Sequence, residues 1–164
     1  MRNRLAIVDE WEKIMIYILL IAGIFGAELG IKNHVEKHRK EGEERPAFGG
    51  ALLLRKYHNR GAFLDMGERV RPLVAFVSVL LSLVMTAVFV MTLGNRGSAV
   101  LKTGLALLLG GAYSNTYDRL RRKYVVDYFS FGVKWQKLRR VVFNLSDFCI
   151  AVGAMMMVLG SGAE

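Results

Sequence analysis

The sequence predicts an all-α membrane protein, a bundle of four transmembrane helices with a small extracytoplasmic β-hairpin or sheet on the membrane surface. Hydrophobic residues make up 53% of the 164 residues, and the mean hydropathy is +0.30, which is more apolar than soluble domains are. The apolar residues also gather into four stretches, each close to the roughly 20 residues that a helix needs to cross a bilayer. We expect one domain, residues 1–164, without a separate soluble domain.

The first expected span covers residues 12–32. A cleaved signal peptide is the alternative here, because the N-terminal flank is basic. The flank also carries acidic residues directly before the apolar run, which is wrong for such a signal. Glu28 and Lys32 lie one helical turn apart and can pair near the end of a retained helix. We therefore expect a retained transmembrane helix.

The other three expected spans cover residues 72–94, 98–118 and 141–162. The second contains no charged residue, and the third has Lys102 near its start, where a long cationic side chain can reach the interface. The fourth contains Asp147 as its only charged residue. An ionisable side chain inside a spanning helix is costly, so Asp147 indicates a functional site.

Two extracytoplasmic loops are expected, at residues 33–71 and 119–140. In the first, residues 59–61 supply turn chemistry between two apolar-rich runs and predict a hairpin. In the second, residues 125–133 are β-branched and aromatic and predict a strand, and residues 134–140 form a basic approach to the last helix. Both loops are rich in Lys and Arg, so a simple count under the positive-inside rule places them in the cytoplasm, although folded loops weaken that rule.

Helical spacing gathers small and polar residues of the last two spans onto one face each. The stripe of the third span is Gly104, Leu108, Gly111, Asn115 and Asp118, and that of the fourth is Asn144, Asp147, Ala151 and Ala154. Small residues let helices approach closely in lipid, so we expect these faces to meet. Each Asn or Asp alone is equally well explained as an interhelical hydrogen-bond partner. Their convergence on one face favours a site.

Asp127 and Asp147 are the candidate catalytic residues. Asp127 follows Val125 and Val126 at the edge of a span. Two carboxylates held together in a dry site cannot comfortably both ionise, so one keeps a proton while the other is charged. Such a pair of carboxyl groups is the least that an aspartyl hydrolase needs for catalysis.

The sequence indicates no metal, cofactor or nucleic-acid site. His34, His38 and His58 all lie in the first loop without a Cys or carboxylate that completes a ligand set. Cys149 is the only cysteine, which excludes an internal disulfide. The net charge of +9 lies in connecting loops with no apparent soluble binding face for nucleic acid.

Three motifs around these aspartates resemble those of a known family. They are Ser114-Asn115-Thr116-Tyr117-Asp118-Arg119, Val125-Val126-Asp127-Tyr128 and Phe143-Asn144-Leu145-Ser146-Asp147. In order and spacing they resemble the Gly-Asn-x-x-Asp-Arg, Val-Val-Asp-Phe and Phe-Asn-x-Ala-Asp blocks of the lipoprotein signal peptidases (signal peptidase II), which are four-span intramembrane aspartyl peptidases. Residues 59–63 further resemble the family's Asn-x-Gly-Ala-Ala-Phe segment, and residues 28–32 occupy the place of its Asp-Gln-x-x-Lys segment. The resemblance covers nearly the whole chain.

The resemblance implies an aspartic endopeptidase with Asp127 and Asp147 as its catalytic dyad and no cofactor. Positions that it implies to support the dyad or bind substrate are Asn59, Asn115, Asp118, Arg119, Asn144, Glu28 and Lys32. The implied substrate is a prolipoprotein with a lipid-modified Cys, from which the signal peptide is removed. Membrane lipids are the other expected partner, and we expect a monomer.

The resemblance also implies a location in the bacterial cytoplasmic (inner or cell) membrane. Both termini would lie in the cytoplasm and the dyad near the extracytoplasmic face. This topology opposes the simple charge count. We prefer it, because three ordered motifs are more specific than a tally of Lys and Arg in loops that fold onto the membrane surface.

Several positions depart from the family pattern and leave alternatives open. Ser114 and Lys123 replace Gly, Ser146 replaces Ala, and the segment from Glu28 to Lys32 keeps an acid and the Lys but loses the Gln. One alternative is therefore a divergent or inactive paralogue that acts on a different membrane substrate. The other is a small membrane carrier or adaptor, since intramembrane carboxylates also form proton relays. Against a carrier, the chain shows no duplicated half and no Pro-broken helix pair.

Overall fold

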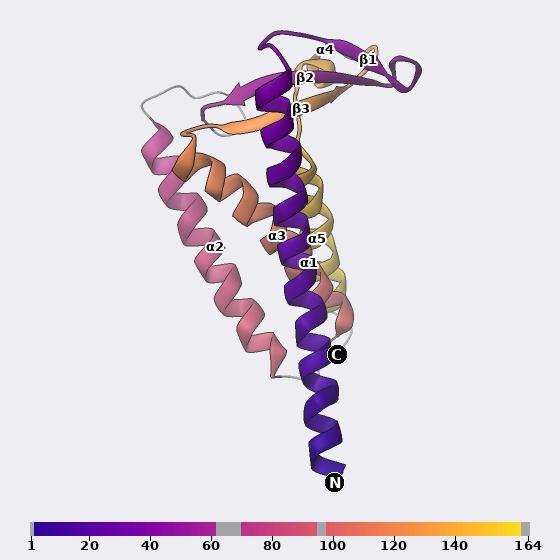
Figure 1. Cartoon of the computed structure of the whole chain (residues 1–164), viewed down its shortest axis with the longest axis vertical. Coiled ribbons are helices and arrows are strands. Elements are labelled where there is room, and N and C mark those ends of the chain that lie inside the picture. The colour runs from indigo at the N-terminus through magenta and orange to yellow at the C-terminus, as the bar shows by residue number, and fades with distance from the viewer. Residues whose placement is uncertain (1, 62–69, 95–97, 162–164) are drawn as a thin grey trace.

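The computed structural model describes residues 2–61, 70–94 and 98–161. Most of these residues are helical (Figure 1). The helices are α1 (Arg2–His38), α2 (Arg71–Leu93), α3 (Ala99–Arg121), the short α4 (Gln136–Arg140) and α5 (Leu145–Ser161). The strands are β1 (Arg45–Ala47), β2 (Leu52–Asn59) and β3 (Val125–Phe131), with a 3-10 turn, η1 (Phe48–Gly50), between the first two. The four long helices form a bundle, and the strands lie across one end of it (Figure 1).

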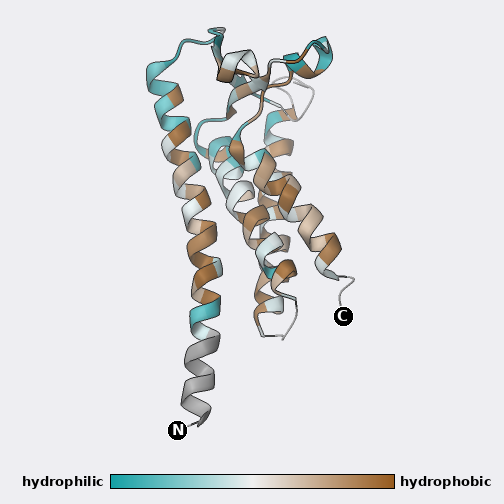
Figure 2. Cartoon of the chain, turned by 90° about the vertical axis from the view of Figure 1, so that its right-hand side faces the viewer, coloured by the Kyte–Doolittle hydropathy of each residue, from teal (hydrophilic) through white to brown (hydrophobic). Residues whose placement is uncertain are grey.

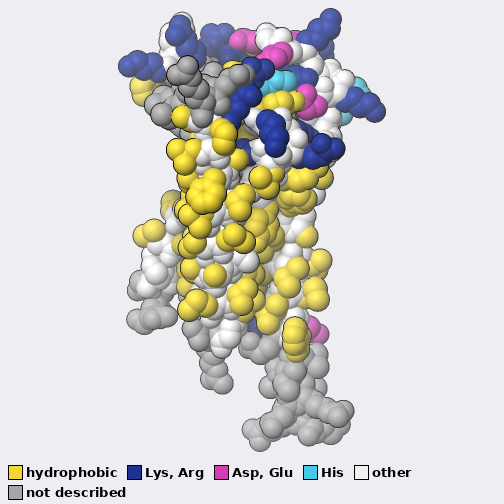
Figure 3. Space-filling view, turned by 90° about the vertical axis from the view of Figure 1, so that its left-hand side faces the viewer, with side chains coloured by type: hydrophobic (Ala, Val, Ile, Leu, Met, Phe, Trp, Pro, Cys, Tyr) yellow, Lys and Arg dark blue, Asp and Glu magenta, His cyan; other side chains and the backbone are white. Residues whose placement is uncertain are grey.

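The outer faces of the bundle are apolar. In Figure 2, apolar residues follow the middle of the helices, and in Figure 3 charged side chains gather at the end that carries the sheet. Among the described residues, two helical segments are long and apolar enough to cross a membrane, Trp11–His38 and Arg71–Leu93. Helix α5 is apolar but shorter, and α3 is the inner helix of the bundle. The membrane-type helical fold is confirmed, whereas the four-span count stays a prediction.

Helices α3 and α5 make the closest contact of the bundle. A Cβ atom on Gly104 would lie 2.7 Å from the carbonyl oxygen of Gly153, and one on Gly111 would lie 2.6 Å from that of Ser146. Only residues without a Cβ let these two backbones approach so closely. The predicted face of α3 is confirmed, because Gly104, Gly111, Asn115 and Asp118 are all buried.

The predicted contact face of α5 is partly wrong. Ala151 and Ala154 are exposed, and the buried residues of this helix are Ser146, Gly153 and Gly160. These three recur every seventh residue, as Gly104, Gly111 and Asp118 do on α3. A seven-residue repeat keeps one seam of a supercoiled helix against its partner, whereas the four-residue steps of the prediction drift away from that seam.

The sheet is antiparallel with the order β1-β2-β3. Asn59 pairs with Val125, and Tyr57 pairs with Asp127 across the β2–β3 ladder. Strand β2 ends at Asn59 as predicted, but its hairpin partner is β1, and the second run of the expected hairpin, from residue 62, lies outside the described residues. The predicted strand after α3 is confirmed as β3.

The last helix begins at Leu145, later than the expected residue 141. Phe143 is held instead as an extended residue against β3. Its N–H donates to the carbonyl of Phe129 at 2.7 Å, and its carbonyl accepts from the N–H of Tyr128 at 2.9 Å. The start of α5 is thereby fixed beside the strand that carries Asp127.

Candidate active site

Asp127 and Asp147 converge on one residue, Asn144. The side-chain nitrogen of Asn144 donates to Oδ1 of Asp127 at 2.6 Å. Its backbone N–H donates to Oδ2 of Asp147 at 3.0 Å. The two carboxylates, from β3 and from α5, therefore lie on either side of a single asparagine.

The local sequence explains the position of Asp147. Asn144 precedes α5, and its Oδ1 accepts from the N–H of Asp147 at 3.0 Å while Asp147 accepts from the N–H of Asn144. This reciprocal pair is a capping box, which satisfies N–H groups that the first turn of a helix leaves without a partner. Asp147 is thus fixed at the helix start.

Asn115 on α3 orients the Asp147 side chain. Its Nδ2 donates to Oδ1 of Asp147 at 3.1 Å. Its Oδ1 accepts from Nζ of Lys32 at 2.8 Å and from Nδ2 of Asn144 at 3.3 Å. Because both of these partners are donors, the amide of Asn115 has to present its own donor to Asp147.

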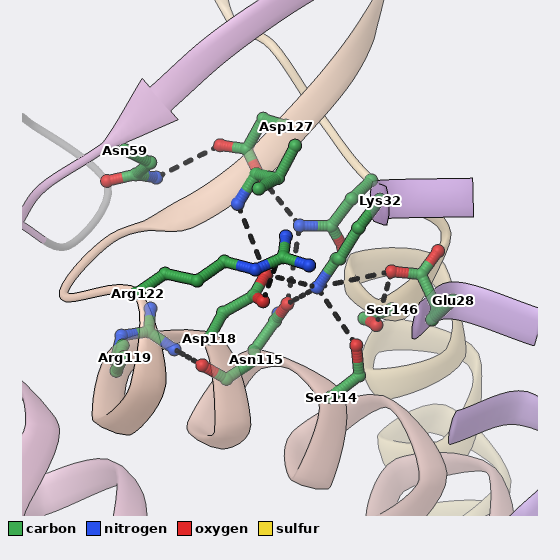
Figure 4. A network of polar contacts seen from close by, with 12 residues as sticks. Glu28, Lys32, Asn59, Ser114, Asn115, Asp118, Arg119, Arg122, Asp127 and Ser146 are labelled. Atoms are coloured by element: carbon green, nitrogen blue, oxygen red, sulfur yellow. Dashed lines mark hydrogen bonds and ion pairs between the residues drawn. The ribbon is translucent and has the colours of Figure 1, made fainter. Parts of the chain in front are cut away.

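Asp127 is buried and has both carboxylate oxygens occupied by amide donors. Asn59 donates from Nδ2 to Oδ2 at 3.1 Å (Figure 4). Asn144 occupies Oδ1. Burial and, after it, the charge of Asp147 raise the pKa of Asp127 to about 7, against the lowering effect of the two amides. A carboxyl with a pKa near neutrality holds or releases a proton readily at physiological pH.

Lys32 on α1 is buried at the centre of a polar cluster (Figure 4). Its ammonium lies 3.2 Å from Glu28 and 3.1 Å from Asp118. It also donates to Oγ of Ser114 at 2.9 Å. Glu28 and Lys32 are both 0% exposed, so their place is behind the dyad rather than on a surface that substrate touches.

Asp118 and Arg119, which are neighbours on α3, make different contacts beside the dyad. Oδ2 of Asp118 accepts from the N–H of Val126 at 3.2 Å, which ties α3 to β3 next to Asp127. Arg119 donates from Nη1 to the carbonyl of Asn115 at 3.3 Å. Asp118 also pairs with Arg122 at 3.3 Å, a partner that the sequence reasoning missed although its i,i+4 spacing could have indicated it.

A cavity of about 420 Å³ opens beside Asn59 and Arg119. It lies between the end of β2, the start of α2 and the end of α3, and its lining is basic and apolar. The lining residues are Asn59, Arg60, Arg71, Pro72, Val74, Ala75, Arg119, Leu120, Lys123 and Tyr124. Asn59 connects this cavity to Asp127.

The structure brings the predicted site residues into one region. Asn59, Asn115 and Asn144 contact the aspartates directly, whereas Asp118, Glu28 and Lys32 form the layer behind them. Sequence reasoning missed the hydroxyl of Tyr128, which contacts Glu28. The three histidines lie elsewhere: His34 stacks on His38, and His58 contacts Glu36. Among the residues that the structure describes, no group of three His, Cys, Asp or Glu side chains is placed to hold a metal ion.

The fold is that of known membrane enzymes. Two solved structures, each described as "Bacterial membrane enzyme structure by the in meso method", at 2.3 Å and 1.9 Å resolution, superpose with TM-scores of 0.74 and 0.75. The first is 17% identical in sequence, and the match covers 89% of this chain and 87% of the solved one. The second is 16% identical, and the match covers 92% of this chain and 95% of the solved one. At such low identity the likeness concerns the fold alone.

Sequence comparison identifies the family. The family model described as signal peptidase (SPase) II matches residues 5–162. A lipoprotein signal peptidase of Halothermothrix orenii is 30% identical over 145 residues, which cover 88% of this chain and 93% of the relative. Another lipoprotein signal peptidase, of Caldicellulosiruptor bescii, is 29% identical over 153 residues, which cover 92% of this chain and 95% of the relative. The chain belongs to the signal peptidase II family, and it is an aspartic peptidase of that type.

Proposed function

We propose that this protein is an intramembrane aspartyl endopeptidase that removes the signal peptide from lipid-modified prolipoproteins, with Asp127 and Asp147 as its dyad. The observation that carries the proposal is the shared contact with Asn144, which bonds to both carboxylates. The relatives named lipoprotein signal peptidase support the substrate class.

The reaction follows from two carboxyl groups that share one proton. The ionised carboxylate takes a proton from a water molecule, whose oxygen attacks the carbonyl carbon of the scissile bond. The protonated carboxyl donates a hydrogen bond to the carbonyl oxygen and then gives its proton to the leaving nitrogen as the C–N bond breaks. Asn59, Asn115 and Asn144 hold the two carboxyl groups in place through this exchange.

The proposed topology has one domain of four spans, formed by α1, α2, α3 and α5, with both termini in the cytoplasm. The dyad and the sheet then lie at the extracytoplasmic face. Support comes from the arrangement of the elements: the sheet lies at one end of the bundle, and the described starts and ends of the chain, at α1 and α5, lie toward the other (Figure 1). A substrate that consists of a signal helix and a diacylglyceryl-modified Cys reaches such a site sideways from the lipid.

A cleavage assay on the purified protein tests this function. The substrate is a synthetic precursor peptide with a diacylglyceryl Cys, and the same peptide without lipid tests the lipid requirement. We expect Asp127→Asn and Asp147→Asn to abolish cleavage, and Glu41→Gln, at an exposed position, to leave it unchanged. Full activity in either Asp variant refutes the dyad. Equal cleavage of the unlipidated peptide refutes the proposed substrate class.

A further inference from the structure

Glu28 is a buried carboxylate on α1 that contacts both segments carrying the aspartates. Its Oε1 accepts from the hydroxyl of Tyr128 at 2.5 Å. Its Oε2 accepts from the hydroxyl of Ser146 at 2.9 Å (Figure 4). Tyr128 is the residue directly after Asp127, and Ser146 is the residue directly before Asp147. One carboxylate thus bridges the two catalytic segments from behind.

The hydroxyl of Tyr128 also joins β3 to the start of α5. It accepts from the N–H of Leu145 at 2.9 Å while it donates to Glu28. Leu145 is the first residue of α5, so this bond satisfies an N–H that the first turn leaves without a helical partner. Burial and the bond to Glu28 raise the pKa of Tyr128 above its ordinary value, so its hydroxyl stays protonated and remains a donor.

The charge of Glu28 is balanced within the same cluster. Lys32 lies 3.2 Å from Oε2 and also contacts Asp118. A buried carboxylate is stable only where a cation and hydrogen-bond donors surround it. The cation here is Lys32, and the two donors that complete the shell are the hydroxyls of Tyr128 and Ser146.

These contacts connect several departures from the family pattern. Tyr128 stands at the Phe of the second block, Ser146 at the Ala of the third, and Ser114 at the Gly of the first. All three place a hydroxyl on the Glu28–Lys32 pair, since Ser114 accepts from Lys32 at 2.9 Å. These three residues therefore form one interacting set in space, although they are far apart in the sequence.

We infer that Glu28, Tyr128 and Ser146 form a positioning cluster that sets the separation and orientation of Asp127 and Asp147. The inference rests on the proposed function, because it concerns the geometry of that dyad. We assign all three a positioning role rather than a contact with substrate. They act by holding β3 and the start of α5 at a fixed distance, and a displacement of about 1 Å at a reacting centre is enough to cost a large part of the rate.

The test removes one hydroxyl at a time, which leaves the buried charges balanced. Tyr128→Phe and Ser146→Ala are expected each to lower kcat about tenfold with little change in KM, because a lost hydrogen bond to a charged group alters the dyad geometry but not substrate binding. Matched controls are Tyr113→Phe, whose hydroxyl contacts Thr86, and Ser82→Ala, whose hydroxyl contacts Thr116. Both controls lose a hydroxyl from the same bundle and are expected to keep the parental kcat.

The double variant separates a positioning role from general loosening. Two independent losses of about tenfold would multiply to a loss of about a hundredfold in kcat. If both hydroxyls act through Glu28, the double variant loses clearly less than this, because the effects of residues that act as a unit are not additive. The inference is overturned if the single variants keep the parental kcat, if they lose no more than the controls, if the loss appears in KM alone, or if the losses multiply fully. Cleavage by Asp127→Asn would instead remove the proposed function itself, so the two failures are distinguishable.

Discussion

Asn59 donates from its side-chain nitrogen to Oδ2 of Asp127 at 3.1 Å across the β2–β3 ladder. The carboxyl that it contacts has a pKa raised to about 7, mainly by burial and then by the charge of Asp147. Below about pH 7 this carboxyl holds the proton that the reaction needs, and above it the proton is lost. We expect kcat/KM for cleavage to fall as the pH rises through about 7, which a pH–rate profile measures. Activity that keeps rising well into alkaline pH would contradict this assignment.

Replacement of Asn59 by Ala should move that alkaline limb to higher pH. The hydrogen bond from Asn59 stabilises the ionised form and lowers the pKa of Asp127. Without this hydrogen bond, the pKa of Asp127 rises further under the effects of burial and of the Asp147 charge, so Asp127 keeps its proton to a higher pH. The shift is read from the same profile on parent and variant, and a shift toward lower pH would show that Asn59 acts otherwise.

Asn144→Ala should lower both stability and activity. The variant loses the cap of α5, which costs about 1 kcal/mol in helices generally, and also the contact with Asp127. A matched control is Ser98→Ala, because Ser98 caps α3 by accepting from the N–H of Val100 and lies away from the dyad. Thermal unfolding should show the loss of a cap in both variants and a further loss in Asn144→Ala, which leaves an oxygen of buried Asp127 without its donor. Cleavage should fail in Asn144→Ala alone. Equal activity of the two variants would mean that Asn144 serves only as a cap.

Lys32→Met should lower the thermal stability of the protein more than replacement of a surface Lys does. It leaves Glu28 buried without its cation and Asp118 with Arg122 as its remaining cation. Breaking a buried ion pair on one side costs ~3–5 kcal/mol. Addition of Glu28→Gln should recover part of the stability, since it removes the charge that Lys32→Met leaves without a cation. The measurement is thermal unfolding in detergent, with Lys134→Met at an exposed position as the reference. No recovery in the double variant would place the cost elsewhere.

Gly153→Ala should loosen the contact between α3 and α5. An added Cβ would lie 2.5 Å from the carbonyl oxygen of Gly104, and overpacking of this kind costs about 1–3 kcal/mol. Gly23→Ala on α1 is the control, because no atom lies within 4 Å of a Cβ added there. The melting temperature should drop only for Gly153→Ala. Ala favours a helix more than Gly does, so a drop of the same size in both variants would show that the loss does not come from this contact.

The sequence was sufficient to predict the helical membrane fold, the strand that carries Asp127 and the buried face of α3. Apolar length and the spacing of Gly111, Asn115 and Asp118 are local signals, and the structure confirms them. The predicted face of α5 failed at Ala151 and Ala154, because the rotation of a helix about its axis is set by its partner. The spacing of small residues four apart along α5 does not specify this rotation.

The polar contacts were predicted only in part. The motifs indicated that Asn115 and Asn144 lie near the aspartates, which the geometry bears out. The contact of Glu28 with Tyr128 joins residues one hundred positions apart in the chain, and no local pattern connects them. Such contacts depend on how α1 docks against β3 and α5, which the sequence does not display.

Asn144 has a consequence for how the protein is made. Because it caps the last helix and also contacts Asp127, the second acid and the residue that orients the first arrive together, with the final helix. A nascent chain that ends before Asn144 lacks both Asp147 and the Asn144 side chain, which donates to Asp127. The proposed dyad is therefore completed only when the final helix has been made.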